Sequence, residues 1–198
     1  MRKLVYLVAT SLDGCITTEP AADPRWLVLQ GPHNHDLNVE FPEMTPGHLR
    51  DAVGIAPSTV NARFDTVIMG RHTYDIGTAV GVTSPYPHLQ QVVVSQTLRD
   101  APDPAIHLVG GDPIQYVREL KKESKRDIWL CGGGTLAASL YDELDELILK
   151  ISPIAIGAGV PLFGGRVAHH VWTMTQHRVY RNGFSLVRYR RALPGVTG

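Results

Sequence analysis

Three consecutive glycines, Gly132 to Gly134, separate a short apolar run from a segment with helical periodicity in the stretch "DIWLCGGGTLAASLYDELDELIL". A helix that starts directly after a turn directs its free N–H groups and the positive end of its dipole at the turn, which favours an anion there. Glycine also lets a ligand approach the backbone closely. The pattern predicts a phosphate-binding turn, with a tight turn of purely structural role as the alternative.

The glycines also fit the dinucleotide fingerprint G-x-G-x-x-G/A through Gly132, Gly134 and Ala137. That motif needs an acidic residue about 20 positions later, at the end of the next strand. The sequence has Ile151, Ser152 and Pro153 there, and it contains no G-x-x-x-x-G-K-[ST] motif. The turn therefore indicates phosphate binding in a fold other than the two most familiar nucleotide-binding ones.

Three further apolar runs end in polar or glycine residues, in the segments "VATSLDG", "VIMGRHTYD" and "VVVSQTL". Ligands of open α/β sheets bind outside the carboxyl ends of the strands. These segments and the glycine turn are therefore expected to meet at one edge of a sheet.

The elements that must position these residues are short strands alternating with helical patterns, in the order expected of a single α/β domain over 1–191 with a tail at 192–198. Strands are expected at "KLVYLVAT", "DTVIMG", "QQVVVS" and "AIHLVG", with helices from "RHTYD" and from Pro113 to about Ser124. Residues 127–151 read as strand, helix, strand. The sheet is predicted to be mostly parallel.

Residues 20–63 are the least regular part, with short helices expected after Thr45-Pro46, where Thr45 caps and Pro46 takes the first position, and near Ser58. Near the C-terminus, "HRVYRNGFSLVRYR" predicts a hairpin with Asn182-Gly183 in a type I′ turn.

Composition excludes several classes of protein. The formal net charge is zero, which gives no electrostatic case for nucleic acid or an anionic membrane as a partner. No apolar run approaches the roughly 20 residues that span a bilayer, and the run Leu4 to Ala9 suits a first core strand better than a signal peptide. Two cysteines, Cys15 and Cys131, offer neither a disulfide framework nor a metal quartet. We expect a cytoplasmic protein without a metal.

Taken together, "SLDG", "MGRHTY", "CGGGTL" and "PIAIGAGVPLF" resemble the dihydrofolate-reductase-like superfamily. The resemblance is closest to the C-terminal reductase domain of the bifunctional riboflavin-biosynthesis enzyme and its stand-alone relatives, and it runs from about Lys3 to Arg190. It implies an α/β fold of three layers, in which helices flank a mixed, mostly parallel sheet with a C-terminal antiparallel hairpin.

The resemblance also implies NADPH as the cofactor. Ala9 would pack on the nicotinamide, with Cys15 and Ile16 beside it in a mobile loop. The remaining cofactor residues would be Gly70, Arg71, His72 and Thr73 in one phosphate loop, Ser95, Gln96 and Thr97 around the adenosine 2′-phosphate, and Gly132, Gly133, Gly134, Thr135 and Leu136 under the nicotinamide and pyrophosphate. Relatives commonly have Arg at the position of Gln96.

The implied activity is hydride transfer to a C=N or C=O carbon of a small heterocyclic substrate of the pteridine or pyrimidine type. Asp13 is the candidate catalytic residue that would make polar contacts at the mouth of the substrate site. The alternative is a structural role, because "LDG" is also a common turn sequence. "HNHDLNVEF" puts Asp36 only in rough register with the acid of folate reductases, and His33 and His35 lack a third metal ligand.

Two alternatives stay open. One is a riboflavin-biosynthesis 5-amino-6-(5-phosphoribosylamino)uracil reductase, whose substrate phosphate would need basic partners such as Arg25, Arg50 and Arg63. The other is a nucleotide-binding module without turnover. The apolar "GVPLFGG" segment and the long hairpin predict a homodimer.

Overall fold

The computed structural model describes residues 1–20, 22, 24–27, 29–123, 125–165 and 168–192. Its main feature is an eight-stranded sheet with the order β5-β4-β3-β6-β1-β7-β10-β9. The strands are β1 (Leu4–Thr10), β3 (Phe64–Gly70), β4 (Gln90–Val94), β5 (Ile106–Val109), β6 (Asp127–Gly132), β7 (Glu146–Ile151), β9 (Trp172–Val179) and β10 (Ser185–Arg191). Two short strands, β2 (Cys15–Thr17) and β8 (Val160–Pro161), pair separately.

The strands from β5 to β7 run parallel, and only β10 and β9 are antiparallel to their neighbours. β1 lies between β6 and β7, and all seven of its residues are buried. A strand covered on both faces must be apolar on both, which is why "LVYLVA" shows no alternation of polar and apolar residues. The predicted mostly parallel sheet is confirmed.

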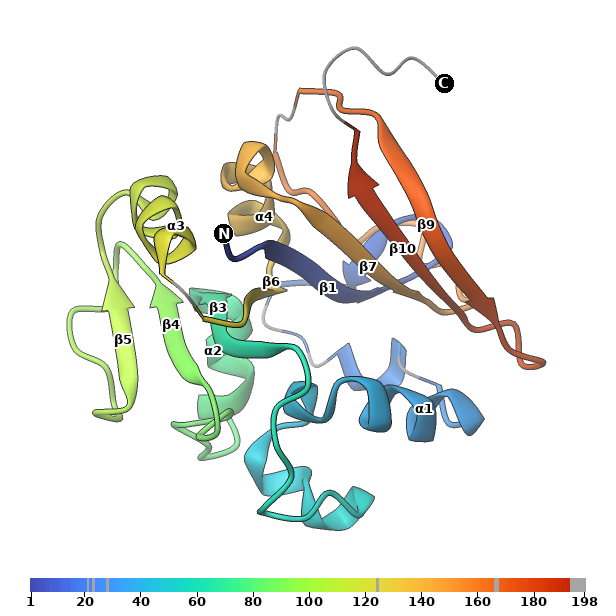
Figure 1. Ribbon diagram of the computed structural model, residues 1–198, viewed down its shortest axis with the longest axis horizontal. Coiled ribbons are helices and arrows are strands. Elements are labelled where there is room, and N and C mark those ends of the chain that lie inside the picture. The colour runs from blue at the N-terminus through green and yellow to red at the C-terminus, as the bar shows by residue number, and fades with distance from the viewer. Residues whose placement is uncertain (21, 23, 28, 124, 166–167, 193–198) are drawn as a thin grey trace.

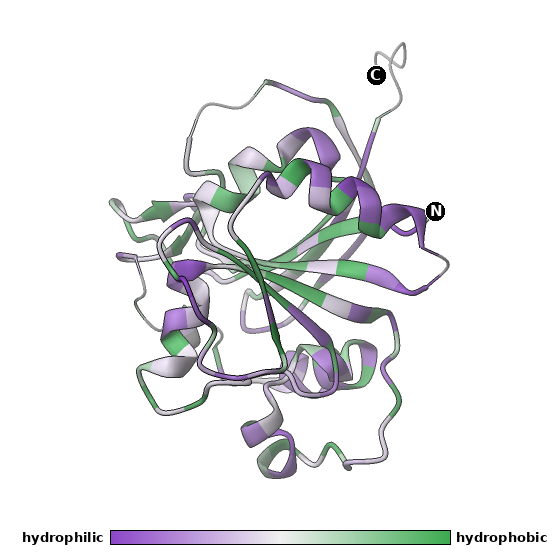
Figure 2. Cartoon of the chain, turned by 90° about the vertical axis from the view of Figure 1, so that its left-hand side faces the viewer, coloured by the Kyte–Doolittle hydropathy of each residue, from purple (hydrophilic) through white to green (hydrophobic). Residues whose placement is uncertain are grey.

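Helices cover both faces of this sheet (Figure 1), and they are α1 (Pro32–Glu40), α2 (Arg71–Thr78), α3 (Pro113–Lys122) and α4 (Gly134–Ser139). One core gathers Val117 of α3 and Ala137 of α4 against Tyr6, whereas the other gathers Leu37 of α1 and Tyr74 of α2 against Leu7. Figure 2 shows hydrophobic stretches along the strands in the middle of the molecule and both characters on the helices. The three-layer prediction is confirmed. None of the helices in the described ranges has the length and apolar character needed to cross a bilayer.

The region 20–63 differs from its prediction. It contains α1, which the sequence did not reveal, and four 3-10 turns at Pro24–Leu27, Pro42–Met44 (η2), Gly47–Leu49 and Asp51–Val53. Thr45 caps no helix, because the turn after it begins at Gly47 with Pro46 at the cap. No helix forms near Ser58. α1 escaped detection because it has few apolar residues: only His33 and Leu37 are buried.

The C-terminal hairpin is present, but its turn lies one residue earlier than predicted. The N–H of Gly183 donates to the carbonyl oxygen of Tyr180 at 2.9 Å, which centres the turn on Arg181 and Asn182. Gly183 follows with φ +83°, and the N–H of Tyr180 bonds to the carbonyl oxygen of Phe184. The prediction of a two-residue type I′ turn is therefore wrong, because Gly183 is the left-handed residue that ends a three-residue loop.

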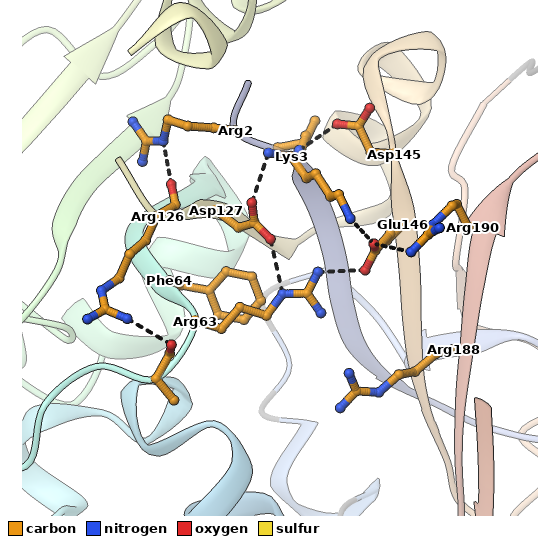
Figure 3. A network of polar contacts seen from close by, with 12 residues as sticks. Arg2, Lys3, Arg63, Phe64, Arg126, Asp127, Asp145, Glu146, Arg188 and Arg190 are labelled. Atoms are coloured by element: carbon orange, nitrogen blue, oxygen red, sulfur yellow. Dashed lines mark hydrogen bonds and ion pairs between the residues drawn. The ribbon is translucent and has the colours of Figure 1, made fainter. Parts of the chain in front are cut away.

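A network of charges joins the amino ends of the parallel strands (Figure 3). Glu146 at the start of β7 pairs with Lys3 at 2.6 Å and with Arg63 at 2.5 Å. Arg63 also reaches Asp127 of β6, and the N–H of Lys3 donates to the same carboxylate. Burial alone would raise the pKa of Glu146, but the hydrogen bonds from Arg63 and Lys3 outweigh it and lower the pKa.

We predict that Glu146→Gln lowers the free energy of unfolding at pH 7 by about 1–3 kcal/mol, because Lys3, Arg63 and Arg190 lose their shared partner. A lowered pKa in the folded state stabilises the protein above the ordinary carboxyl pKa and is lost as the pH falls through the folded value. The difference in the free energy of unfolding between Glu146→Gln and the unmodified protein, measured by urea unfolding, should therefore be largest near neutral pH and smaller below about pH 4. A difference that does not shrink in acid would contradict this role.

Candidate functional site

Six parallel strands end at one edge of the sheet, in the order β5, β4, β3, β6, β1, β7. The register pairs Gly70 with Val94 across β3 and β4, Met69 with Gly132 across β3 and β6, and Ala9 with Lys150 across β1 and β7. The segments in which the sequence predicted a site therefore lie side by side. This is the edge at which open α/β sheets bind ligands.

The glycine turn after β6 packs against the start of α2. A Cβ on Gly70 would lie 3.6 Å from the amide nitrogen of Gly133, so the two backbones nearly touch. The Gly132–Gly133 peptide bond is cis, and Gly132 has φ +143°, a value that L side chains rarely adopt.

Around Gly132 and Gly133 the protein leaves space. A Cβ on either residue would meet only the hydroxyl of Thr73, at 3.5 Å. The positive φ accounts for glycine at position 132, but neither packing nor backbone conformation explains the missing side chain of Gly133, whose φ is −88°. A hydroxyl, the N–H groups of a helix start and two bare peptide units together form a cradle that suits a phosphate or a flat ring.

Gly134 lacks a side chain for a different reason. A Cβ there would overlap the carbonyl oxygen of Pro161, and the N–H of Gly164 donates to the carbonyl oxygen of Gly134 at 2.9 Å. The close neighbour is the chain's own 161–164 segment, not a cofactor, which corrects the single explanation for all three glycines. Of the next two predicted residues, Thr135 is exposed, whereas Leu136 is buried in the core.

The start of α2 presents Arg71 and His72 near the cradle. His72 is exposed, and the Nε of Arg71 donates to the carboxylate of Asp75 one turn later, at 2.6 Å. Because that pair is partly exposed, it is a weak restraint. Asp75 therefore partly neutralises the charge of Arg71 but does not fix its side chain.

The loop after β4 is shaped by Ser95. Its hydroxyl accepts hydrogen bonds from the N–H groups of Thr97 and Leu98, at 3.2 and 3.0 Å, and the residue is buried. The Ser95 hydroxyl therefore stabilises the loop through these two hydrogen bonds. Gln96 and Thr97 are exposed and carry the polar groups that the loop offers to solvent.

Asp13 holds another loop in place. Its carboxylate accepts from the N–H groups of Ile156 and Gly157 and from the hydroxyl of Ser11. The Ser11 hydroxyl and then these backbone bonds lower the pKa of Asp13 to about 2. Its catalytic role stays a prediction; at neutral pH this carboxyl group has no proton to give.

Ala9 is 8% exposed at the end of β1, next to the cradle. Cys15 and Ile16 were expected in a mobile loop, but they form β2, which pairs with β8, and both side chains are buried. The segment is held because Cys15 and Thr17 pair with Pro161 and Val160.

Sequence reasoning missed a buried polar cluster beside Ala9. Lys150 is 8% exposed, and its Nζ lies 3.1 Å from the sulfur of Met44. Burial lowers the pKa of Lys150 to about 8 and raises the pKa of Cys131 to about 11, and the hydroxyl of Tyr86 lies 3.9 Å from that thiol. A lysine within the apolar run "ELILKI" was the available signal.

Several other candidates lie elsewhere. His33 is buried and stacks on Phe184, whereas His35 is exposed, and among the described residues no cluster of three or more potential metal ligands occurs. Asp36 accepts from the hydroxyl of Tyr180 at 2.8 Å. It lines, with His35, a hollow of about 460 Å³ between α1 and β9, which none of the predicted cofactor-binding residues lines.

Of the three arginines considered as phosphate partners, Arg50 and Arg63 already have partners within the protein. Arg50 is buried and donates to the carbonyl oxygen of Pro42 at 2.9 Å. Arg63 lies in the charge network at the opposite edge of the sheet. The side chain of Arg25 lies outside the described part.

Comparisons with known proteins agree with this architecture. The uncharacterized protein YwjB of Bacillus subtilis is 27% identical to this chain, and the match covers 82% of this chain and 83% of YwjB. A second uncharacterized protein of the same organism, YyaP, is 28% identical, and the match covers 51% of this chain and 60% of YyaP. The crystal structure of a candidate riboflavin biosynthesis protein from Shewanella sp. PV-4 superimposes with a TM-score of 0.74 at 25% identity, covering 98% of this chain and 100% of that one.

Two more distant structures share the fold. A diaminohydroxyphosphoribosylaminopyrimidine deaminase/5-amino-6-(5-phosphoribosylamino)uracil reductase from Thermotoga maritima gives a TM-score of 0.65 at 14% identity, covering 96% of this chain and 57% of the larger protein. Dihydrofolate reductase from Enterococcus faecalis, complexed with NADP(H), gives 0.63 at 14% identity, covering 96% of each chain. The family model of the RibD C-terminal domain matches residues 2–186, and the chain therefore belongs to the RibD C-terminal domain family, with a dihydrofolate-reductase-like fold.

Proposed function

We propose that this protein is an NADPH-dependent reductase of a small heterocyclic acceptor of the pteridine or pyrimidine type. The observation that carries the proposal is the open space of the cradle at Gly133, where neither the protein's own packing nor the backbone φ of −88° explains the missing side chain. Membership of a family with reductase relatives, and a fold shared with a dihydrofolate reductase that was solved with NADP(H), support the same conclusion.

Besides the glycines after β6, the residues that would hold the cofactor come from the ends of β3, β4 and β1. Gly70 and Thr73 would face a phosphate at the start of α2, Gln96 and Thr97 would meet the 2′-phosphate, and Ala9 would form an apolar floor beside the ring. When bound, NADPH supplies a hydride. The protein would orient the acceptor carbon over Ala9, exclude water and place a proton donor near the acceptor heteroatom.

Among acceptors, a ribosylaminopyrimidine is the second candidate, because the structurally similar Thermotoga protein is a deaminase/5-amino-6-(5-phosphoribosylamino)uracil reductase. Arg50 and Arg63 give no support for a substrate phosphate, since both have other partners. Absorbance of the reduced nicotinamide, followed with this pyrimidine and with 7,8-dihydrofolate, tests both acceptors. NADPH binding without oxidation by any acceptor would favour a binding module.

We predict that Gly133→Val weakens NADPH binding by roughly tenfold or more, at least 1.4 kcal/mol, while the chain still folds. The side chain would enter the open space of the cradle, and Gly133 has φ −88°, which valine can adopt. Calorimetric titration gives the dissociation constant, and thermal melting gives the stability.

Gly134→Ala is the matched control. Its Cβ would overlap the carbonyl oxygen of Pro161, so this variant should lose thermal stability, in contrast to Gly133→Val. An unchanged dissociation constant in Gly133→Val would remove the cradle from the cofactor site.

We predict a preference for NADPH over NADH that is smaller than in relatives with Arg at position 96. A charge-assisted hydrogen bond contributes about 1.5–3 kcal/mol, which corresponds to about one to two decades in affinity. Gln96→Arg should widen the preference, and Arg71→Ala should narrow it. Arg118→Ala is the control, because Arg118 is exposed and pairs with Glu143 instead. Equal affinities for NADH and NADPH, unchanged by Arg71→Ala, would refute this assignment.

We propose that the chain forms a two-fold homodimer. Leu162 and Phe163 of "GVPLFGG" pack against the chain's own core, so this segment gives less support than expected. The hairpin gives more: β9 is an eight-residue edge strand, and Met174 and Val179 on it are 51% and 66% exposed. Long edge strands with apolar side chains pair readily with another chain.

The expected mass by light scattering at micromolar concentration is twice that of the chain. Met174→Lys with Val179→Lys should shift the protein to the monomer, because charge on an edge strand opposes pairing. A monomeric mass for the unmodified protein would contradict the dimer.

A further inference from the structure

Lys150 has a position that core packing does not explain. It follows the apolar residues Ile148 and Leu149 of β7, and its register partner across the sheet is Ala9 at the end of β1. Partners in parallel strands point to the same face, so the lysine side chain leaves the sheet on the side of Ala9. On that face its Nζ reaches η2, where it contacts the sulfur of Met44.

The ammonium group lacks a partner of the kind that buried charges require. A thioether is a weak hydrogen-bond acceptor, and none of the carboxylates that the structure describes forms an ion pair with Lys150. A buried charge without a counter-charge destabilises a fold and is retained where it serves a function. Lys121 shows the contrast: it is also buried, but it pairs with Asp145 at 2.7 Å and donates to the carbonyl oxygen of Glu143.

The groups around Lys150 leave its charge uncompensated. Cys131 on β6 and Tyr86 carry raised pKa values, because of burial, and are neutral at pH 7. Glu43 in η2 directs its carboxylate to the backbone N–H groups of residues 62 to 64, and Leu186 on β10, the strand partner on the other side, is apolar. Cys131 and Met44 are only partly buried as residues, whereas Lys150 itself is 8% exposed.

We propose that Lys150 is the proton donor of this reductase and binds the heteroatom of the reducible C=O or C=N group. This inference rests on the proposed function, in which Ala9 lies under the reacting ring. The acceptor carbon receives a hydride, the π electron pair of its double bond moves to the oxygen or nitrogen, and the ammonium of Lys150 gives that atom a proton. The lysine is left as a neutral amine, which solvent protonates again.

The charge also selects the substrate. An ammonium attracts a neutral or anionic acceptor oxygen or nitrogen and repels an iminium that is already protonated. The site therefore suits neutral carbonyl or imine groups of an uncharged or anionic heterocycle. Because the donor is a lysine whose pKa is lowered to about 8, turnover should decline as the pH rises above that value.

Lys150→Met tests the proposal, with Lys121→Met as the matched control. Removal of an unpaired buried charge should raise the melting temperature by about 3 °C or more at pH 7, whereas Lys121→Met, which leaves Asp145 without its partner, should lower it. A lysine whose pKa is lowered on folding destabilises the fold fully below the folded value, and this effect disappears as the pH approaches the ordinary value. The increase in the melting temperature of Lys150→Met should therefore be largest below about pH 8 and should shrink toward pH 10.

Ligand readouts complete the test. NADPH should bind Lys150→Met within twofold of the unmodified protein, and kcat for an acceptor that the unmodified protein reduces should fall about 10²-fold or more, with loss of the alkaline decline. In the unmodified protein, NMR of the Lys150 amine should show a lower pKa with NADP⁺ than with NADPH, because only the oxidised ring is positively charged.

A fall in the melting temperature of Lys150→Met as large as that of Lys121→Met would overturn the proposal, as would an amine pKa that is the same with both cofactors. Failure of the unmodified protein to bind NADPH is a different result: it removes the proposed function and, with it, this role of Lys150.

Discussion

The position of β1 between β6 and β7 is the constraint on which the rest of the structure depends. A central strand that is buried on both faces must satisfy its backbone through its two neighbours. The register that achieves this aligns Leu4 with Ile128 and Thr10 with Ile151. At one edge the same register gathers the charges of Lys3, Asp127 and Glu146, and at the other it brings Ala9 beside the glycine turn and Lys150. The two edges therefore have different characters: one is closed by ion pairs, and the other is left open to a ligand.

The open edge combines two requirements in one short motif. Gly132 and Gly133 leave space above the backbone, whereas Gly134 makes room for the segment that contains Pro161 and Gly164. Asp13 fixes the beginning of that segment by accepting hydrogen bonds from Ile156 and Gly157. Thus the loop after β1, the loop after β7 and the glycine turn hold one another, although they are distant in the sequence. A cofactor site needs such support, because small displacements of orienting groups weaken catalysis.

The strands and the glycine turn could be predicted because their signals are local. Apolar runs that end in glycine or polar residues define where a parallel strand stops, and "RHTYD" and "CGGGTL" mark helix starts. α1 could not be predicted in this way, since His33 and Leu37 are its only buried residues. The roles of Gly134 and Asp13 depend on contacts with residues 156–164, which no local pattern reveals. The same holds for Lys150, whose significance comes from the absence of a described carboxylate partner in three dimensions.

The central place of β1 also has a consequence for how the chain is made. β1 is synthesised before the other strands of the sheet, but its neighbours begin at Asp127 and Glu146, so this apolar strand waits for its partners until both have been synthesised. Contacts between residues so far apart in the sequence slow folding, because a long loop must close before they form. Until then "LVYLVA" is an unpaired strand of the kind that promotes aggregation. We therefore infer that β3 and β4, which are adjacent in both sequence and space, assemble before β1 and provide the surface on which β6 and then β1 complete the sheet.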